Sequence, residues 1–150
     1  MNRKITDQAE MEIAVKKYFE TLTTTQAGQF NAMLNPEPVA CSYAEKTLTV
    51  ALRVEPWMVN PAGILHGGIE ASIMDFTMGV LSRLCMDGKL TPTVSMNIEY
   101  LRSFQIGDRV LVTAVCEKCG SHLSYISARA WEEKSPEKIA LTASATYYTG

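Results

Sequence analysis

The change of hydrophobic period near residue 90 is the feature that most constrains how this chain can fold. From residue 67 to residue 85, large apolar residues recur every three or four positions, which is typical of a helix with one buried face. From Thr93 onward, apolar and polar residues alternate in four segments separated by SFQIGD, EKCGSH and EEKSPEK, which is typical of strands. We expect these strands to form an antiparallel meander. One long helix among antiparallel strands predicts an α+β fold and not a parallel sheet.

The first third of the chain adds a second helix and a hairpin. Residues 6–25 have amphipathic helical spacing, with Ile13, Ala14, Lys17 and Tyr18 at the spaced positions. The segment NAMLNPEP ends this helix with two prolines. Alternation over residues 47–54 predicts a strand, paired with residues 39–43 across a turn. We therefore divide the chain into an N-terminal helix and linker, residues 1–35, and a main domain, residues 36–150.

Composition and charge exclude several classes of function. The 150 residues are 47% hydrophobic and 20% charged, with a net charge of −2 and scattered Lys and Arg, so nucleic acid is not the expected partner. No apolar run approaches the ~18 residues that span a bilayer, so we expect no membrane partner. The first twenty residues turn charged before an apolar leader could form, and the four cysteines follow no secreted pattern. We expect a cytoplasmic protein with reduced thiols.

The long helix carries one face of small residues interrupted by an acid. At 100° per residue, this face comprises Gly68, Ala71, Ser72, Asp75, Gly79 and Ser82. A ligand could lie against such a face beside Asp75. The other interpretation is close packing against a neighbouring element, with Asp75 solvated or bonded to a backbone amide, as acids on helices commonly are.

The start of this helix, His66-Gly67-Gly68, suits an anion or a developing oxyanion. A helix N-terminus presents unpaired N–H groups and positive partial charge. Glycines at positions 67 and 68 let a ligand approach these amides without meeting a Cβ atom. Together with a carboxylate farther along the same helix, this start favours acyl-transfer chemistry.

Two segments resemble a known family. NPAGILHGGIEASIMD closely resembles the PaaI-like acyl-CoA thioesterases of the hotdog fold, in which His-Gly-Gly opens the central helix and an acid follows nine positions after the histidine, as Asp75 follows His66 here. Asn60, six positions before the histidine, also recurs in some members. TVSMNIEYLRSFQIGDRV resembles the family's following strand-turn-strand, and Thr93 falls where one branch has a serine hydroxyl.

The resemblance implies a hotdog fold, with an antiparallel sheet of five or six strands wrapped around the long helix and an extra N-terminal helix outside the family motifs. It implies hydrolysis of acyl-CoA without a cofactor, because coenzyme A is part of the substrate, and without a metal. It also implies a homodimer, paired again into a homotetramer. Each active site would then combine Gly67, Asn60 and His66 of one subunit with Asp75 and Thr93 of the other.

We assign the roles that thioester hydrolysis requires. Asp75 is either a general base for water or a nucleophile, a choice that the sequence leaves open. The Gly67 amide holds the oxyanion, and Thr93 holds the water. Asn60 orients the water or the carboxylate, while His66 fixes the loop or polarises the carbonyl. Gly68, Ser72 and Arg102 are predicted to contact the substrate. Glu70 lies about 140° around the helix from Asp75, and we interpret it as a structural or rim residue.

Alternative functions were weighed on the same residues. A Ser-His-Asp hydrolase from Ser72, His66 and Asp75 lacks the Gly-x-Ser-x-Gly elbow. A metal site from Cys116, Cys119 and His122 lacks a second ligand pair, so reduced turn cysteines are the preferred interpretation. A hotdog dehydratase would need a different histidine and acid arrangement. The main alternative is a non-catalytic acyl-CoA-binding or sensing protein, which has no need of an acid at position 75.

Overall fold

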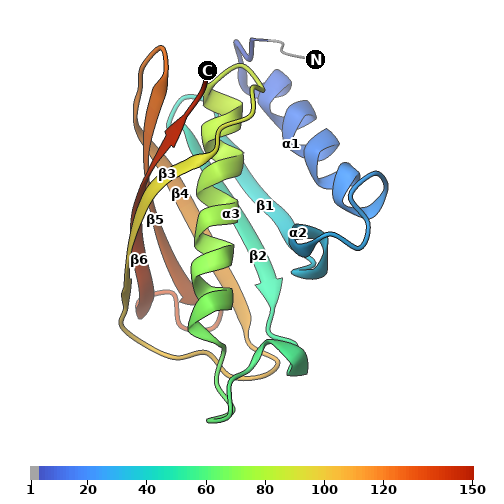
Figure 1. The fold of residues 1–150 in the computed structure, drawn as a ribbon, viewed down its shortest axis with the longest axis vertical. Helices are drawn as coiled ribbons and strands as arrows, with labels where there is room; N and C mark the ends of the chain where they lie inside the picture. Colours follow the sequence, from blue (N-terminus) through green and yellow to red (C-terminus); the bar gives the residue numbers. More distant parts are fainter. Residues whose placement is uncertain (1–3) are drawn as a thin grey trace.

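A computed structural model describes residues 4–150, in which one six-stranded antiparallel sheet curls around a long helix (Figure 1). The elements are α1 (Gln8–Thr23), α2 (Phe30–Met33), β1 (Glu37–Ser42), β2 (Thr47–Arg53), a short 3-10 turn η1 (Pro56–Met58), α3 (Gly67–Cys85), β3 (Thr93–Tyr100), β4 (Arg109–Cys119), β5 (Leu123–Glu132) and β6 (Ile139–Tyr148). The predicted α+β architecture, both helices and all six strands are confirmed.

The order of the strands differs from the predicted meander. The sheet runs β1-β2-β4-β5-β6-β3, so β3 pairs with β6 at one edge and does not touch β4. The link between β3 and β4 is anchored under the start of α3, where Phe104 is fully buried and its carbonyl accepts a hydrogen bond from the Leu65 amide at 2.9 Å. The chain therefore crosses the end of the sheet instead of turning back at once.

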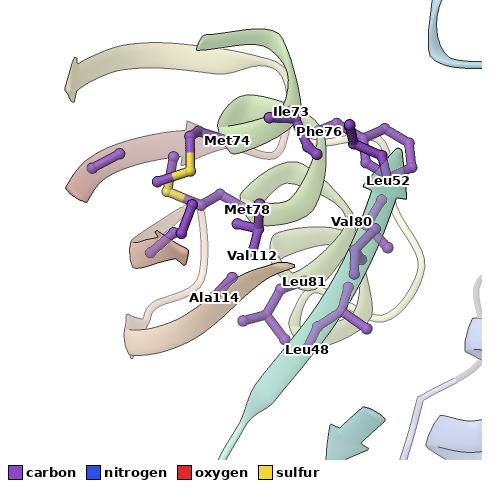
Figure 2. Close-up of a cluster of buried hydrophobic side chains, with 14 of the residues drawn as sticks. Leu48, Leu52, Ile73, Met74, Phe76, Met78, Val80, Leu81, Val112 and Ala114 are labelled. Atoms are coloured by element: carbon purple, nitrogen blue, oxygen red, sulfur yellow. The ribbon is translucent and has the colours of Figure 1, made fainter. Parts of the chain in front are cut away.

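Helix α3 fills the concave face of the sheet. Ile73, Met74, Met78 and Leu81 are fully buried. Figure 2 shows Leu81 beside Leu48 of β2 and Met78 near Val112 of β4. Because the sheet twists and curls, strands on either side of α3 contribute to a single hydrophobic core. This packing fixes which face of α3 remains outside the core.

Helix α1 packs on the main domain with a different face from the one that its sequence indicated. Its Asp7 N-cap accepts a hydrogen bond from the Glu10 amide at 2.9 Å. The buried residues are Met11, Val15, Phe19 and Leu22, while Ile13 is 67% exposed. The Phe19 ring meets the Phe76 ring of α3 edge to face, with centroids 5.8 Å apart. The expected helix is confirmed. The prediction that the face with Ile13 is the apolar face is wrong, because the stripe of Met11, Val15 and Phe19, spaced i, i+4, i+8, carries the larger packing surface.

Glu70 is the one acid that this packing buries in α3. It is only 5% exposed, and its carboxyl group has no hydrogen-bond or ion-pair partner among residues 4–150. Burial raises the pKa of this carboxyl from its ordinary 4.5 to about 7. Of the two interpretations of Glu70, as a structural or as a rim residue, burial therefore favours the structural one.

We predict that Glu70→Gln stabilises the protein at pH 8 by about 2–3 kcal/mol. A carboxyl whose pKa is raised in the folded state contributes stability below the unfolded value, which is lost as the pH rises through the folded value. The advantage of the variant should therefore shrink between pH 7 and pH 4.5. Urea unfolding across this range measures it, with the exposed Glu20→Gln as control. Equal stability of Glu70→Gln and wild type at pH 8 would contradict the prediction.

Candidate active site at the start and middle of α3

His66 is the N-cap of α3 and explains the second glycine of the motif. Its Nδ1 accepts a hydrogen bond from the Gly68 amide at 2.9 Å. A Cβ atom on Gly68 would lie 3.1 Å from this Nδ1 and 3.3 Å from Cε1 of the same ring. A side chain at position 68 would therefore press on the imidazole that caps the helix. His66 fixes the loop geometry, in agreement with one of its two predicted roles.

Gly67 presents a free amide at the first position of α3. Among residues 4–150, no group accepts a hydrogen bond from its N–H, whereas its carbonyl accepts one from the Tyr100 hydroxyl at 3.0 Å. Tyr100 lies at the end of β3, so the sheet edge holds the helix start in place. An unpaired helical N–H of this kind is suited to a developing oxyanion.

Asn60 organises the loop that leads into α3. Its Oδ1 accepts hydrogen bonds from the Ala62 backbone amide at 2.9 Å and the Ile64 backbone amide at 3.4 Å. The backbone N–H of Asn60 donates to the Ile64 carbonyl oxygen. No acceptor for its Nδ2 is found in the described part of the chain. The free Nδ2 can donate to a water molecule or a thioester oxygen.

Asp75 is half-buried on α3 and is held by two hydroxyl groups. Its Oδ1 accepts hydrogen bonds from Thr93 Oγ1 at 2.8 Å and from the Tyr147 hydroxyl at 2.9 Å. The same Tyr147 hydroxyl lies 3.1 Å from the Asp75 backbone carbonyl. Both side-chain bonds fall on Oδ1, which leaves Oδ2 without a partner in residues 4–150. The predicted Asp75–Thr93 pair therefore lies within one chain.

Tyr147 is the site residue that the sequence analysis missed. It is almost fully buried, and burial, followed by the neighbouring Asp75 carboxylate, raises its pKa well above the usual range. The phenol therefore stays protonated and donates. Its ring lies over Gly79, where an added Cβ would meet Cε1 at 3.5 Å. In the sequence, the only sign of this residue is a large tyrosine among the small inward-facing residues of β6. The sequence does not show which side chain it contacts, because that depends on how the strands pair.

The rest of the small-residue face is divided between the site and the core. Ala71, Ser72 and Gly79 are half-buried, whereas Ser82 is completely buried and its hydroxyl pairs with that of Ser124 at 2.7 Å. The Ser72 hydroxyl donates to the Gly68 carbonyl at 2.6 Å.

These contacts bear on two alternative functions, a Ser-His-Asp hydrolase and a metal site. Ser72, His66 and Asp75 each bond to other groups, so no Ser-His-Asp relay forms. No cluster of three or more His, Cys, Asp or Glu residues able to hold a metal is found between residues 4 and 150. His122 stacks on Tyr148, away from the cysteines.

The two halves of the site are separated along the helix. Gly67 and Asp75 are eight residues apart, which corresponds to about 12 Å at 1.5 Å per residue. A thioester carbonyl group cannot touch the amide of one and the carboxylate of the other within one chain. The exposed Arg102 follows β3, and its side chain has no partner in the described residues.

Comparisons with known proteins identify the family of this chain. The family model of the thioesterase superfamily matches residues 62–139. Mouse acyl-coenzyme A thioesterase 13 is 30% identical over 100 residues, covering 66% of this chain and 71% of that protein. The human protein of the same name is 27% identical over 117 residues, covering 77% and 82%.

Solved structures share the fold at low identity. Zebrafish thioesterase superfamily member 2 superposes with a TM-score of 0.79 at 24% identity, covering 91% of this chain and 96% of that one. The PaaI protein of the E. coli phenylacetic acid degradation operon superposes with a TM-score of 0.73 at 16% identity, covering 91% and 95%.

The hotdog fold, a six-stranded sheet around a helix that opens on His-Gly-Gly, and the family match together define a hotdog thioesterase, which is a thioester hydrolase. The chain belongs to the thioesterase superfamily. In residues 4–150, no helix combines the length and the apolar character that crossing a bilayer requires.

We predict that Tyr147→Phe lowers both stability and turnover while keeping the fold. Loss of one buried hydrogen bond to a carboxylate should cost about 1–3 kcal/mol in unfolding free energy, and thioester hydrolysis should fall about tenfold as Asp75 loses its orientation. The neighbouring Tyr148→Phe, on the exposed side of β6, is the matched control. Urea unfolding and steady-state kinetics measure both effects, and identical behaviour of the two variants would remove Tyr147 from the site.

Proposed function

We propose that this protein hydrolyses acyl-CoA thioesters to a free acid and coenzyme A. The observation that carries the proposal lies on α3. Asp75 of this helix accepts hydrogen bonds from the hydroxyl groups of Thr93 and Tyr147, and the same helix begins with the unpaired Gly67 amide. The curated relatives named as acyl-coenzyme A thioesterases support the substrate class. A Streptococcus mutans protein of the same fold was crystallised with acetyl CoA, with a TM-score of 0.69 at 23% identity.

A homodimer with shared sites is part of this proposal. One edge of β3 pairs with β6, and the other has no strand partner within residues 4–150. Val94, near the start of β3, and Leu101, the residue after its end, are 60% and 57% exposed, an unusual surface for a sheet edge left in water. Antiparallel addition of a second β3 would cover this edge and bring Asp75 of one subunit near Gly67 of the other. A tetramer and a cytoplasmic location stay predictions.

Each residue then has a defined task in hydrolysis. The Gly67 N–H donates to the thioester carbonyl oxygen as it becomes an oxyanion, and the positive end of α3 stabilises the same charge. A water molecule donates one hydrogen bond to Thr93 Oγ1 and gives its proton to the free Oδ2 of Asp75 as it attacks the carbonyl carbon. Asn60 Nδ2 orients the water from the facing subunit. Coenzyme A leaves as a thiol, and Arg102 contacts its phosphates.

The opposite choice, direct attack by Asp75, predicts a different isotope result. An anhydride intermediate that water attacks at the Asp75 carbonyl would transfer an oxygen of the Asp75 carboxylate into the product. In a single turnover in ¹⁸O-labelled water, general-base catalysis places the label in the released acid. A label that appears first in Asp75 would establish the nucleophilic route instead.

We predict that Asp75→Asn keeps the fold and acyl-CoA binding but lowers kcat about 10²–10⁴-fold. The change removes the proton acceptor and preserves the shape of the side chain. Coenzyme A release from aryl, short and long aliphatic acyl-CoA substrates measures the effect, and Asp87→Asn is the control. Wild-type protein that binds these substrates without hydrolysing any of them would support a binding or sensing protein, while undiminished turnover by Asp75→Asn would remove Asp75 from the mechanism.

We predict that Gly67→Pro loses about 10²–10³ in kcat while Gly67→Ala loses less. Proline lacks the N–H but suits the first helical position, and the extended backbone of His66 (φ −66, ψ 131) is compatible with a following proline. A Cβ at position 67 meets only Tyr100 Cε1 at 3.5 Å, an ordinary contact. Both variants should therefore fold, and only Gly67→Pro removes the donor. Equal kcat values for the two variants would exclude the Gly67 amide as the oxyanion donor.

If each active site contains residues of both subunits, the same two variants allow a second experiment. When Asp75→Asn and Gly67→Pro chains are unfolded together and refolded at equal amounts, half of the dimers should combine one of each. Each mixed dimer holds one site with both native halves, so the mixture should recover about a quarter of wild-type activity. Activity no greater than that of the separate variants would contradict a site made of two chains.

A further inference from the structure

Strand β3 is hydrogen-bonded to both halves of the proposed site on α3. It runs beside α3 in the opposite direction (Figure 1). Its first residue, Thr93, donates to the Asp75 carboxylate at 2.8 Å, and its last residue, Tyr100, donates to the Gly67 carbonyl oxygen at 3.0 Å. The proposed mechanism gives a task to Thr93 and none to Tyr100.

The Tyr100 hydroxyl group holds one end of a single peptide unit. The Gly67 carbonyl and the Gly68 N–H belong to the same planar group. The carbonyl accepts the hydrogen bond from Tyr100, and the N–H donates to His66 Nδ1 at 2.9 Å. This peptide unit is therefore held from both sides, by the residue that caps α3 and by a residue of β3.

The preceding peptide unit carries the free N–H of the site. Its carbonyl, that of His66, accepts hydrogen bonds from the Ile69 amide at 2.8 Å and the Glu70 amide at 3.0 Å. Its N–H, that of Gly67, has no acceptor among residues 4–150. The two units meet at the Cα atom of Gly67, and glycine restricts rotation between them less than any other residue does. Because the second unit is fixed, the first unit and its free N–H have less freedom to turn.

The ring of Tyr100 also lies against Gly67. A Cβ atom added to Gly67 would meet Cε1 of this ring at 3.5 Å and its Cζ at 3.8 Å, which are ordinary van der Waals distances. The backbone next to the ring is hydrogen-bonded to β6, because the amides of Leu101 and Arg102 donate to the Ala140 carbonyl oxygen at 2.8 and 3.1 Å. The hydroxyl group therefore reaches Gly67 from a strand end that is itself held in place.

Tyr100 buries too little surface for core packing to explain its position. It is 51% exposed, whereas Tyr147, the tyrosine that binds Asp75, is 1% exposed. Met96 and Ile98, on the same side of β3 as Tyr100, make the contacts of this strand with the hydrophobic core. The contact that Tyr100 adds is the one with Gly67.

We propose that Tyr100 is a positioning residue for thioester hydrolysis, an inference that rests on the proposed function. Its hydroxyl group holds the peptide unit after Gly67, and this keeps the Gly67 N–H directed at the point where the oxyanion forms. Tyr100 donates its one hydroxyl proton to a backbone carbonyl, so it does not itself stabilise the oxyanion. Its effect on the rate therefore acts through the Gly67 amide.

Amide exchange tests the positioning without any substrate. In the full chain labelled with ¹⁵N-glycine, the Gly68 N–H should exchange with solvent about threefold to tenfold faster in Tyr100→Phe than in wild type, because its peptide unit loses one of two anchors. The amide of Gly88, which donates to the Arg83 carbonyl oxygen at the far end of α3, is the internal reference. Unchanged exchange at Gly68, or equally faster exchange at Gly88, would overturn the proposal.

Kinetics of paired variants test whether the effect acts through Gly67. Tyr100→Phe should lower kcat about tenfold with KM nearly unchanged, both in the wild-type chain and in Gly67→Ala, which keeps the N–H. In Gly67→Pro, which has no N–H to position, the same change should alter kcat by less than about twofold. Tyr125→Phe, at a tyrosine of β5 that is 44% exposed, is the matched control and should leave kcat unchanged.

Two kinetic results would overturn the role of Tyr100. A loss of kcat that is the same in Gly67→Pro as in wild type would indicate a general effect on the fold, which thermal melting of each variant measures separately. A rise in KM without a loss of kcat would indicate a contact with the substrate. Wild-type protein that hydrolyses no acyl-CoA would contradict the proposed function, while the exchange rates at Gly68 would still support or overturn the anchoring by Tyr100.

Discussion

The burial of α3 against one curved sheet is the interaction on which the other features depend. A sheet that contacts the helix from both sides leaves only a narrow strip of α3 outside the core. That strip contains the glycines, Ser72 and Asp75, because any large residue there would have been drawn into the core or left exposed. The site is therefore a consequence of packing: residues that the core does not need are the residues available for chemistry.

The electrostatics of α3 follow from the same packing. Two acids lie on one helix, and they differ in what surrounds them. Asp75 faces hydroxyl groups from β3 and β6, whereas Glu70 faces the apolar interior with no partner in residues 4–150. Hydroxyl donors stabilise a carboxylate, and burial without donors stabilises the neutral acid. The thioesterase chemistry needs the first environment, and the second leaves Glu70 as a cost in stability that this fold carries at neutral pH.

The two ends of α3 meet different surroundings. At the start, an unpaired amide and a positive dipole end suit an oxyanion, and this half of the site needs a second chain to meet Asp75. At the end, α3 brings Cys85 to the bulged strand β4, where the Cys119 thiol lies 3.4 Å from the Cys85 carbonyl oxygen. A single helix thus reaches from the start of the site to these cysteines, about 27 Å apart along its axis at 1.5 Å per residue.

The sequence by itself determined the elements, the His-Gly-Gly start of α3 and the Asp75–Thr93 pairing, because local periodicity and family motifs depend on neighbours along the chain. Only the tertiary structure decided that β3 pairs with β6, that Tyr147 donates to Asp75, that Glu70 and Ser82 are buried, and that the Cys119 thiol approaches the Cys85 carbonyl oxygen. These four results depend on the order of the strands, on the bulge in β4 and on which face α3 turns toward the sheet. Each arises from contacts between residues far apart in the chain, where a shift of one position reverses the direction of a side chain.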